Sequence, residues 1–149
     1  MKKIIVLAAF AILGISASSF AGTSGPQVPL SVARQFTQQF DHAMDVKWEA
    51  GSNFYKATFA DWGKVLFAFY ADNGDFLGVA TNLSSTVLPA KLKAEIKRSY
   101  GNYWITDLFG YHNKDGKGFV ITLENADRVL VLKADGNDGW SVYKSTVKA

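Results

Sequence analysis

Histidine is the side chain best suited to acid–base and metal chemistry at neutral pH, and this chain contains two, His42 and His112. Neither lies in an HExxH pattern, and the chain has no cysteine that could complete a zinc site. His42 stands at the end of a predicted helix, and His112 stands beside a predicted turn at residues 114 to 117. The pattern therefore favours solvated or hydrogen-bonded histidines over a catalytic or metal-binding pair.

Two acidic segments that contain glycine, residues 72 to 75 (DNGD) and 135 to 139 (DGNDG), have the composition of calcium loops. An EF-hand loop also requires a glutamate six residues after its central glycine, and neither segment has one. Asn73 and Gly74 form the dipeptide most typical of a type I′ hairpin turn, because both residues tolerate a positive φ angle. Both segments are therefore interpreted as turns between strands.

Motifs for nucleophilic catalysis and for phosphate binding are also missing from the sequence. No serine lies in a GxSxG pattern, and no glycine-rich phosphate loop follows a predicted strand. The sequence therefore predicts a protein that is not an enzyme and that uses no cofactor and no metal.

The elements that would position a binding site occur twice along the chain. The pair Val28–Pro29 aligns with Leu88–Pro89, sixty positions later, and apolar residues at helical spacing follow both pairs. Two later pairs of segments also align: residues 55 to 59 with 119 to 123, and residues 67 to 72 (FAFYAD) with 130 to 135 (LVLKAD). The sequence predicts two repeats, at residues 30 to 83 and 88 to 147, each with one helix and four strands.

Short apolar segments with strand periodicity follow each predicted helix and are separated by turn signals. The expected helices cover residues 31 to 43 and 89 to 100, and the expected strands cover residues 46 to 49, 54 to 60, 64 to 71, 76 to 82, 104 to 112, 118 to 124, 128 to 134 and 140 to 147. Each repeat is too small to bury its helix and its sheet face well alone, so one fused domain, residues 30 to 149, is expected. The predicted fold class is α+β: a tandem αβ4 repeat with two helices packed on one face of an antiparallel sheet of about eight strands.

Strand alternation divides the side chains of the sheet between two faces. We expect Phe67 and Phe69 to face the helices, which places Tyr70 on the open face, and by the repeat we expect Leu130 and Leu132 to face the core. An open face with large aromatic side chains is a candidate docking surface for a protein. Its expected protein-binding residues, with the lysines at the rim, are Lys56, Trp62, Tyr70, Trp104, Tyr111, Lys133 and Trp140. The alternative is that cross-strand packing or a homodimer uses these residues.

The N-terminus has the three-part pattern of a secretory signal. Two lysines precede an apolar run from Ile4 to Ile15, and small residues follow up to Ala21. The apolar run is too short for a membrane anchor, which needs about 20 residues. We therefore predict a signal peptide at residues 1 to 21, a flexible leader at residues 22 to 29, and a periplasmic or secreted product with no stable membrane anchor.

The basic character of the whole chain, with a net charge of +3, comes largely from this signal. Two of the 16 basic residues lie in it, which leaves 14 basic against 13 acidic residues in the exported chain. A balance so close to neutral argues against a nucleic-acid partner. Four basic residues of the second helix are assigned to its solvated side and not to a lipid-binding face: Lys91, Lys93, Lys97 and Arg98.

Two segments carry a family resemblance: DVKWE at residues 45 to 49 and FAFYADNGDFLG at residues 67 to 78. With the signal and the tandem repeat, they resemble the secreted PepSY-like proteins, also described as β-lactamase-inhibitor-like (BLIP-like) proteins and common in Bacteroidetes. The resemblance covers about residues 30 to 147 and implies a curved eight-stranded sheet whose concave face clasps an enzyme and blocks its active site. The chain lacks the cysteines of true β-lactamase inhibitors and matches none of their contact loops, so no contact residue is carried over.

The resulting hypothesis is an exported, non-enzymatic binding protein that inhibits or regulates a secreted or envelope enzyme, such as a peptidase or a β-lactamase-like protein. Its partner would be an unidentified exported or envelope protein. One alternative is a carrier of a small ligand or a cell-wall fragment, which needs an enclosed pocket of roughly 300 Å³ or more. Another is a structural envelope component that assembles through sheet edges.

Overall fold

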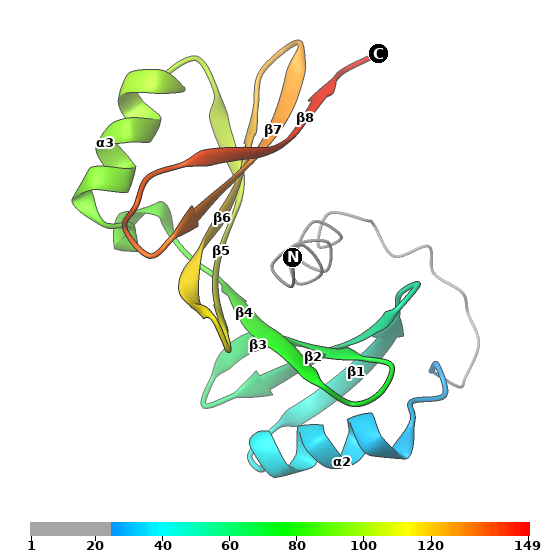
Figure 1. Ribbon diagram of the computed structural model, residues 1–149. Helices are drawn as coiled ribbons and strands as arrows, with labels where there is room; N and C mark the ends of the chain where they lie inside the picture. The colour runs from blue at the N-terminus through cyan, green and yellow to red at the C-terminus, as the bar shows by residue number, and fades with distance from the viewer. Residues whose placement is uncertain (1–24) are drawn as a thin grey trace. The chain divides into compact units, whose positions relative to one another are not determined.

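The computed structural model describes residues 25 to 149, whose helices and strands are shown in Figure 1. The predicted signal peptide and the first residues of the predicted leader lie outside the described residues. In chain order the elements are α2 (Leu30–Gln39), β1 (Met44–Ala50), β2 (Phe54–Asp61), β3 (Lys64–Ala71), β4 (Phe76–Asn82), the 3-10 helix η2 (Ser85–Val87), α3 (Ala90–Ser99), β5 (Trp104–Asn113), β6 (Gly116–Glu124), β7 (Arg128–Asp135) and β8 (Ser141–Val147).

The eight strands form one antiparallel sheet in which every strand pairs with its neighbours in sequence, in the order β1 to β8. Strands β1 and β8 are therefore the two edges of the sheet. The predicted fold class, α+β with two helices and about eight antiparallel strands, is confirmed. The strand boundaries differ from the predicted ones by at most two residues, whereas α2 ends at Gln39 and does not continue to Ala43.

The chain divides into two compact units, with the boundary between Ala80 and Thr81. Unit 1 contains α2 and unit 2 contains α3, and among residues 25 to 149 each unit has a hydrophobic cluster formed by its own residues. The fused domain of residues 30 to 149 that the sequence suggested stays a prediction.

Both helices begin directly after a proline, Pro29 before α2 and Pro89 before α3. The fixed φ angle of proline suits the start of a helix, where a main-chain N–H has no helical partner. Val32 and Leu92, sixty positions apart, are both fully buried. The two helices therefore start alike and bury equivalent residues, and the predicted boundaries of the repeats stay a prediction.

The core of unit 1 lies between α2 and the strands β2 and β3. Phe36 of α2 packs against Phe59 of β2 and against Ala68 and Tyr70 of β3. The rings of Phe36 and Phe59 meet edge to face, with their centroids 4.9 Å apart. Such aromatic pairs contribute about 0.5 to 1.5 kcal/mol beyond the burial of their area, so this contact fixes α2 firmly on the sheet.

The core of unit 2 is mostly aliphatic, whereas that of unit 1 is mostly aromatic. Leu92 of α3 packs with Ile121 of β6 and with Leu130 and Leu132 of β7. The prediction that Leu130 and Leu132 face the core is therefore confirmed.

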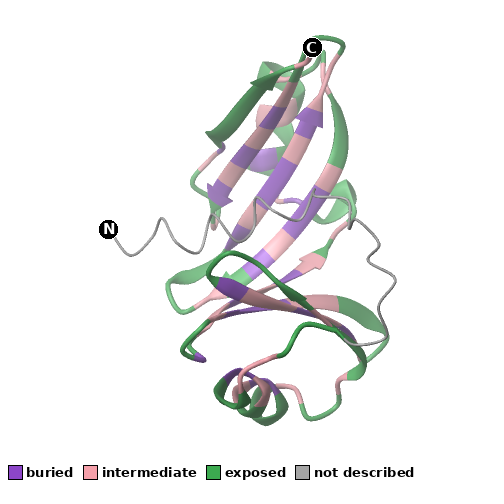
Figure 2. Ribbon diagram, turned by 90° about the vertical axis from the view of Figure 1, so that its right-hand side faces the viewer, coloured by how far each residue is buried: buried purple, intermediate pink, exposed green. Residues whose placement is uncertain are grey.

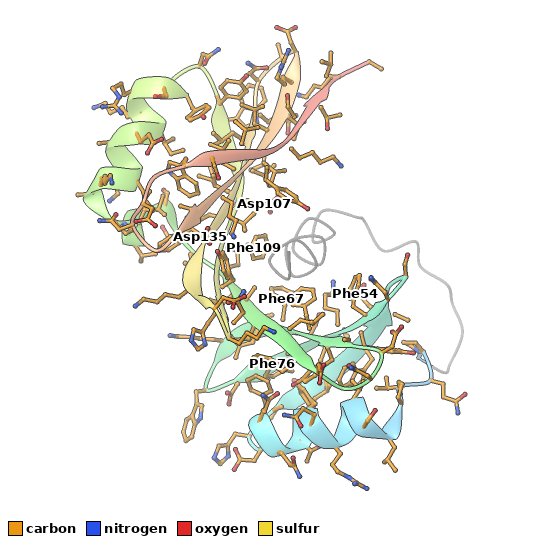
Figure 3. All side chains as sticks on the ribbon, in the orientation of Figure 1. Phe54, Phe67, Phe76, Asp107, Phe109 and Asp135 are labelled. Atoms are coloured by element: carbon orange, nitrogen blue, oxygen red, sulfur yellow. The ribbon has the colours of Figure 1, made fainter. Side chains whose placement is uncertain are left out.

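The prediction of which β3 side chains point towards the helices is wrong. Ala68 and Tyr70 pack towards α2, and Phe67 lies on the side of the sheet away from that helix (Figure 3). The alignment of β3 with β7 was one residue out of register, because the strands start at Lys64 and Arg128, which are 64 positions apart and not 63. A shift of one residue moves every side chain of a strand to the other face, so this alignment turned a wrong facing of β3 into a correct facing of β7.

The positive φ angles of a type I′ turn occur at a different hairpin from the one predicted. Trp62 (φ 47°) and Gly63 (φ 77°) form the two-residue loop between β2 and β3. Between β3 and β4, Gly74 has a φ of 95° but Asn73 has no positive φ, and its Oδ1 accepts a hydrogen bond from the main-chain N–H of Asp75. The segment is a turn, as predicted, but the type I′ assignment is wrong there.

Candidate protein-binding site

The five aromatic residues predicted for the open surface fall into two groups. Tyr70, Tyr111 and Trp140 are buried, whereas Trp62 and Trp104 are 82% and 52% exposed. The prediction that all five lie on the surface is therefore wrong for three of them, which stabilise the fold.

Tyr70 ties β3 to the end of α2. Its ring lies in the core of unit 1 against Phe36 and Phe76, and its hydroxyl donates a hydrogen bond to Oε1 of Gln39 at 2.7 Å. Burial raises the pKa of the Tyr70 phenol. Figure 3 shows Phe76 on this α2 side of the sheet and Phe54 on the other side.

Tyr111 belongs to a polar cluster in unit 2. Its hydroxyl donates a hydrogen bond to Oδ1 of Asp135 at 2.5 Å, and Nζ of Lys133 pairs with the same oxygen at 2.7 Å. The Lys133 ammonium also lies 5.6 Å from the centre of the Tyr111 ring. A Cβ atom at Gly118 would stand 2.6 Å from the Tyr111 hydroxyl, so this position has room only for glycine. Lys133, predicted as a rim residue, is held by these contacts.

The two buried tyrosines make the fold sensitive to alkali. Burial raises the pKa of both phenols, and the hydrogen bond to Asp135 raises that of Tyr111 further. In the unfolded chain a tyrosine loses its proton at about pH 10. At this pH Tyr70 and Tyr111 of the native protein still hold theirs. Above that pH the unfolded state binds fewer protons than the native state, so the free energy of unfolding should fall as the pH rises.

Urea unfolding between about pH 8 and pH 11 measures this effect. A variant with Tyr70→Phe and Tyr111→Phe should start less stable but lose less stability over the same range. Equal losses in the variant and the native protein would mean that other groups cause the alkaline sensitivity.

Trp140 links the segment that directly precedes β8 to α3. Its indole Nε1 donates a hydrogen bond to the main-chain oxygen of Leu92 at 3.0 Å. Its own main-chain N–H points to the carboxylate of Glu95, 3.3 Å from both oxygens. Trp140 is therefore a core residue of unit 2, which corrects its assignment to the docking surface.

Trp62 has the opposite environment, at the tip of the β2–β3 hairpin. It is the most exposed of the large apolar residues in the described chain, and its φ angle of 47° lies in the left-handed region. The ring of His42 packs against it with centroids 5.1 Å apart. An aromatic residue with a positive φ is rare, since the left-handed conformation costs a residue with a Cβ about 1 to 2 kcal/mol.

Two exposed apolar side chains lie near this tip. Met44 of β1 is the partner of Ala60 in β2, which is the partner of Val65 in β3. Residues directly opposite each other share a face, so Met44, Ala60 and Val65 form a row across three strands. Met44 and Val65 are 65% and 53% exposed. We call Trp62, His42, Met44 and Val65 the hairpin patch.

Lys56 lies on the same face as Ala60, further along β2. Its Nζ pairs with Oε2 of Glu49 at 2.6 Å and lies 5.8 Å from the centre of the Phe67 ring. Lys56 was predicted as a rim residue of the docking surface. In the structure its ammonium contacts Glu49 and Phe67 of the same sheet.

Trp104 is exposed at the start of β5, in unit 2. The ammonium of Lys148 lies 5.5 Å from its ring centre and also pairs with Glu124. Trp104 thus lies beside the ion pair of Lys148 and Glu124, in a different unit from the hairpin patch. Its binding role stays a prediction.

Met44 and Val65 were missed as surface residues by sequence reasoning, whereas His42 was expected to be solvated or hydrogen-bonded. The strand periodicity gave no signal for them, because the row they form depends on which strand pairs with which and in what register. A search for apolar residues that flank a two-residue hairpin loop would have found Val65 alone.

Residues 25 to 149 contain no group of three or more His, Cys, Asp or Glu side chains arranged to hold a metal ion. His42 and His112 lie in different units, and Asp41 is the carboxylate next to His42, at 3.6 Å. Among the helices of this range, none is long and apolar enough to cross a membrane.

The class that this architecture defines is the BLIP-like fold, an open antiparallel sheet of eight strands with two helices. A BLIP-like protein from Bacteroides fragilis is similar to this chain with a TM-score of 0.70 and 21% identity, over 85% of this chain and 92% of that one. A DUF2874 family protein from Bacteroides ovatus has a TM-score of 0.71 and 19% identity, over 83% and 89% of the two chains.

A protein from Bacteroides eggerthii, provisionally described as periplasmic, has a TM-score of 0.70 and 11% identity, over 82% of this chain and 90% of that one. At these identities the likeness shows a shared fold. No protein-family model matches the sequence, and no curated protein matches it significantly. The BLIP-like part of the expected resemblance is supported, and the PepSY part stays a prediction.

Proposed function

We propose that this chain is an exported, non-enzymatic protein that binds another exported or envelope protein through the hairpin patch of unit 1. The observation that carries the proposal is Trp62, a large aromatic side chain that is exposed and held in a left-handed turn. Tryptophan is among the residues that most often dominate the energy of protein interfaces.

The backbone conformation of this turn indicates that Trp62 is not there to stabilise the fold. A two-residue type I′ loop is best formed by Asn-Gly, which avoids most of the strain of the left-handed conformation. Backbone strain that the fold does not need is concentrated at functional sites. Met44 and Val65 add apolar area beside the tip, as expected for the centre of an interface.

Export and an inhibitory role are supported by separate observations. The signal pattern of residues 1 to 21 favours export, and one protein of the same fold is provisionally described as periplasmic. Another is described as BLIP-like, after a β-lactamase inhibitor. We therefore propose an inhibitor or regulator of an exported enzyme as the specific form of this binding role.

The small-ligand carrier is the second candidate, and a pocket in unit 2 bears on it. This pocket has a volume of about 280 Å³ and is lined by apolar and basic side chains, among them Leu88, Ile96, Ile105, Lys93 and Lys97. It is open to solvent and is slightly smaller than roughly 300 Å³, the lower end of the range for ligand sites. These properties argue against this pocket as an enclosed ligand site.

The variant Trp62→Asn separates binding from folding. Asparagine followed by Gly63 suits the turn, so the free energy of unfolding should rise by about 1 kcal/mol, while binding to the partner should weaken at least about 30-fold. The partner would be isolated by cross-linking from the envelope and secreted proteins of the native organism, purified, and its Kd measured by calorimetry.

Trp104→Asn is the matched control, because it removes an equally large exposed side chain from unit 2. It should leave the Kd within about twofold. If Trp104→Asn weakens binding and Trp62→Asn does not, the binding site lies in unit 2 and the proposal is wrong.

A further inference from the structure

Strand β8 (Ser141–Val147) is an edge of the sheet, with β7 on one side and, within residues 25 to 149, no strand on the other. All seven of its residues are exposed, and Figure 2 shows the strand in the exposed colour next to the C-terminus. It contains one charged residue, Lys144, and no proline. Edge strands of this kind pair readily with another strand.

The main-chain groups of β8 that point outward can be assigned from one hydrogen bond. The N–H of Lys148 donates to the carbonyl oxygen of Asp127 at 2.8 Å, which continues the ladder in which Val147 faces Arg128. In an antiparallel ladder, residues bonded to the partner strand alternate with residues whose N–H and C=O point away. Val147 and Ser145, one and three positions before Lys148, therefore direct these groups outward.

Strand β1 (Met44–Ala50), the other edge, is protected against pairing. Asp45 has a φ angle of 53°, and the register with β2 shifts between Met44 and Lys47. Charged residues also alternate along it at Asp45, Lys47 and Glu49. Bulges and charges are the devices that keep natural edge strands from pairing. Pairing of β8 with β1 of another copy, which would give open-ended chains, is therefore disfavoured.

We propose that β8 pairs antiparallel with β8 of a second copy of this chain, with Ser145 on the twofold axis. With Lys144 on the axis, two positive charges would face each other, which is destabilising. With Ser145 on the axis, the outward N–H and C=O of the two serines bond to each other. Tyr143 then stands opposite Val147 at both ends, which is a favourable aromatic and β-branched pair.

The pairing covers the segment from Tyr143 to Val147. Before it, the register of β8 on β7 shifts between the partners of Val131 and Leu132, which bends the strand away from a regular edge. A second copy fits this edge because the two strands satisfy each other and the dimer closes by symmetry. The dimer uses unit 2 alone, so it does not rest on the binding role of the hairpin patch in unit 1.

Because the native chain contains no cysteine, single cysteines can test the register directly. In Ser145→Cys the two Cα atoms would lie about 5.5 Å apart across the axis, within the range of a disulfide. In the control Val147→Cys the two Cα atoms would lie roughly 13 Å apart. The exported protein with Ser145→Cys should form a covalent dimer on mild oxidation, at least about tenfold faster than Val147→Cys.

Sedimentation over a range of protein concentrations supplies the second measurement. The native protein should dimerise as its concentration rises, and Ser145→Pro should stay monomeric, because proline removes an outward N–H and keeps the main-chain bonds to β7, losing there only the side-chain bond that the Ser145 hydroxyl accepts from Arg128. Circular dichroism confirms that each variant is folded. A native protein that is monomeric up to about 1 mM, a dimer that persists in Ser145→Pro, or equal cross-linking of both cysteines would each overturn the proposal.

Discussion

Replacement of Tyr70 by alanine is expected to unfold unit 1, although Tyr70 was predicted from the sequence as a surface anchor. The variant should lose about 3 to 5 kcal/mol of stability, because a fully buried aromatic ring leaves a cavity that the core cannot close. It also removes the hydrogen bond that Gln39 accepts from the Tyr70 hydroxyl. Hydrogen exchange measured by mass spectrometry should show lost protection in α2 and β1 to β3, with β5 to β8 unchanged.

Tyr70→Phe is the control for the ring. It keeps the packing against Phe36 and Phe76 and loses the hydrogen bond to Gln39, which costs about 1 kcal/mol. If Tyr70→Ala were as stable as the native protein and lost only its partner, the side chain would be a surface anchor after all.

Replacement of Trp140 by alanine should have a similar effect on unit 2. The indole is buried against Leu92 and donates its N–H to the main chain of α3, so its loss should cost about 3 to 5 kcal/mol. Chemical unfolding gives the size of the loss, and hydrogen exchange should place it in α3 and β5 to β8, with α2 protected.

The control for this variant is Trp104→Ala, which removes the other tryptophan of unit 2. Its side chain is half exposed, so we expect a loss below about 1 kcal/mol. Equal losses in Trp140→Ala and Trp104→Ala would contradict the assignment of Trp140 to the core. Tyr70→Ala and Trp140→Ala would both weaken partner binding through unfolding, which is why Trp62→Asn is the variant that tests the binding site.

Helices and strands were predictable from this sequence because their signals are local. Prolines and apolar residues at helical spacing placed both helices, and alternating apolar residues placed all eight strands within two residues of their observed ends. The face of the sheet on which each side chain lies was harder to predict, because it depends on the exact register of the strand. Tyr70 was placed on the wrong side of β3, and Leu130 and Leu132 were assigned correctly only because the repeat alignment with β7 slipped by one residue.

The candidate site was predictable only at Trp62. A tryptophan beside a glycine in a predicted turn suggests exposure, and the structure confirms that exposure. Tyr111 and Trp140 are also aromatic residues beside a glycine, but both are buried. The Tyr111 hydroxyl donates to Asp135 and the Trp140 indole donates to Leu92, and both partners are distant in sequence. Buried tyrosine and tryptophan side chains usually have a hydrogen-bond partner, and no sequence pattern shows that partner.

The order of the sheet has a consequence for how the chain folds. Every strand pairs with the next one along the chain, and each core is closed by residues of one unit. Contacts between residues close in sequence have a small loop-closure cost and form quickly. A chain that emerges N-terminus first can therefore complete the contacts of unit 1 before β5 to β8 follow, which shortens the time during which unpaired strands are open to aggregation.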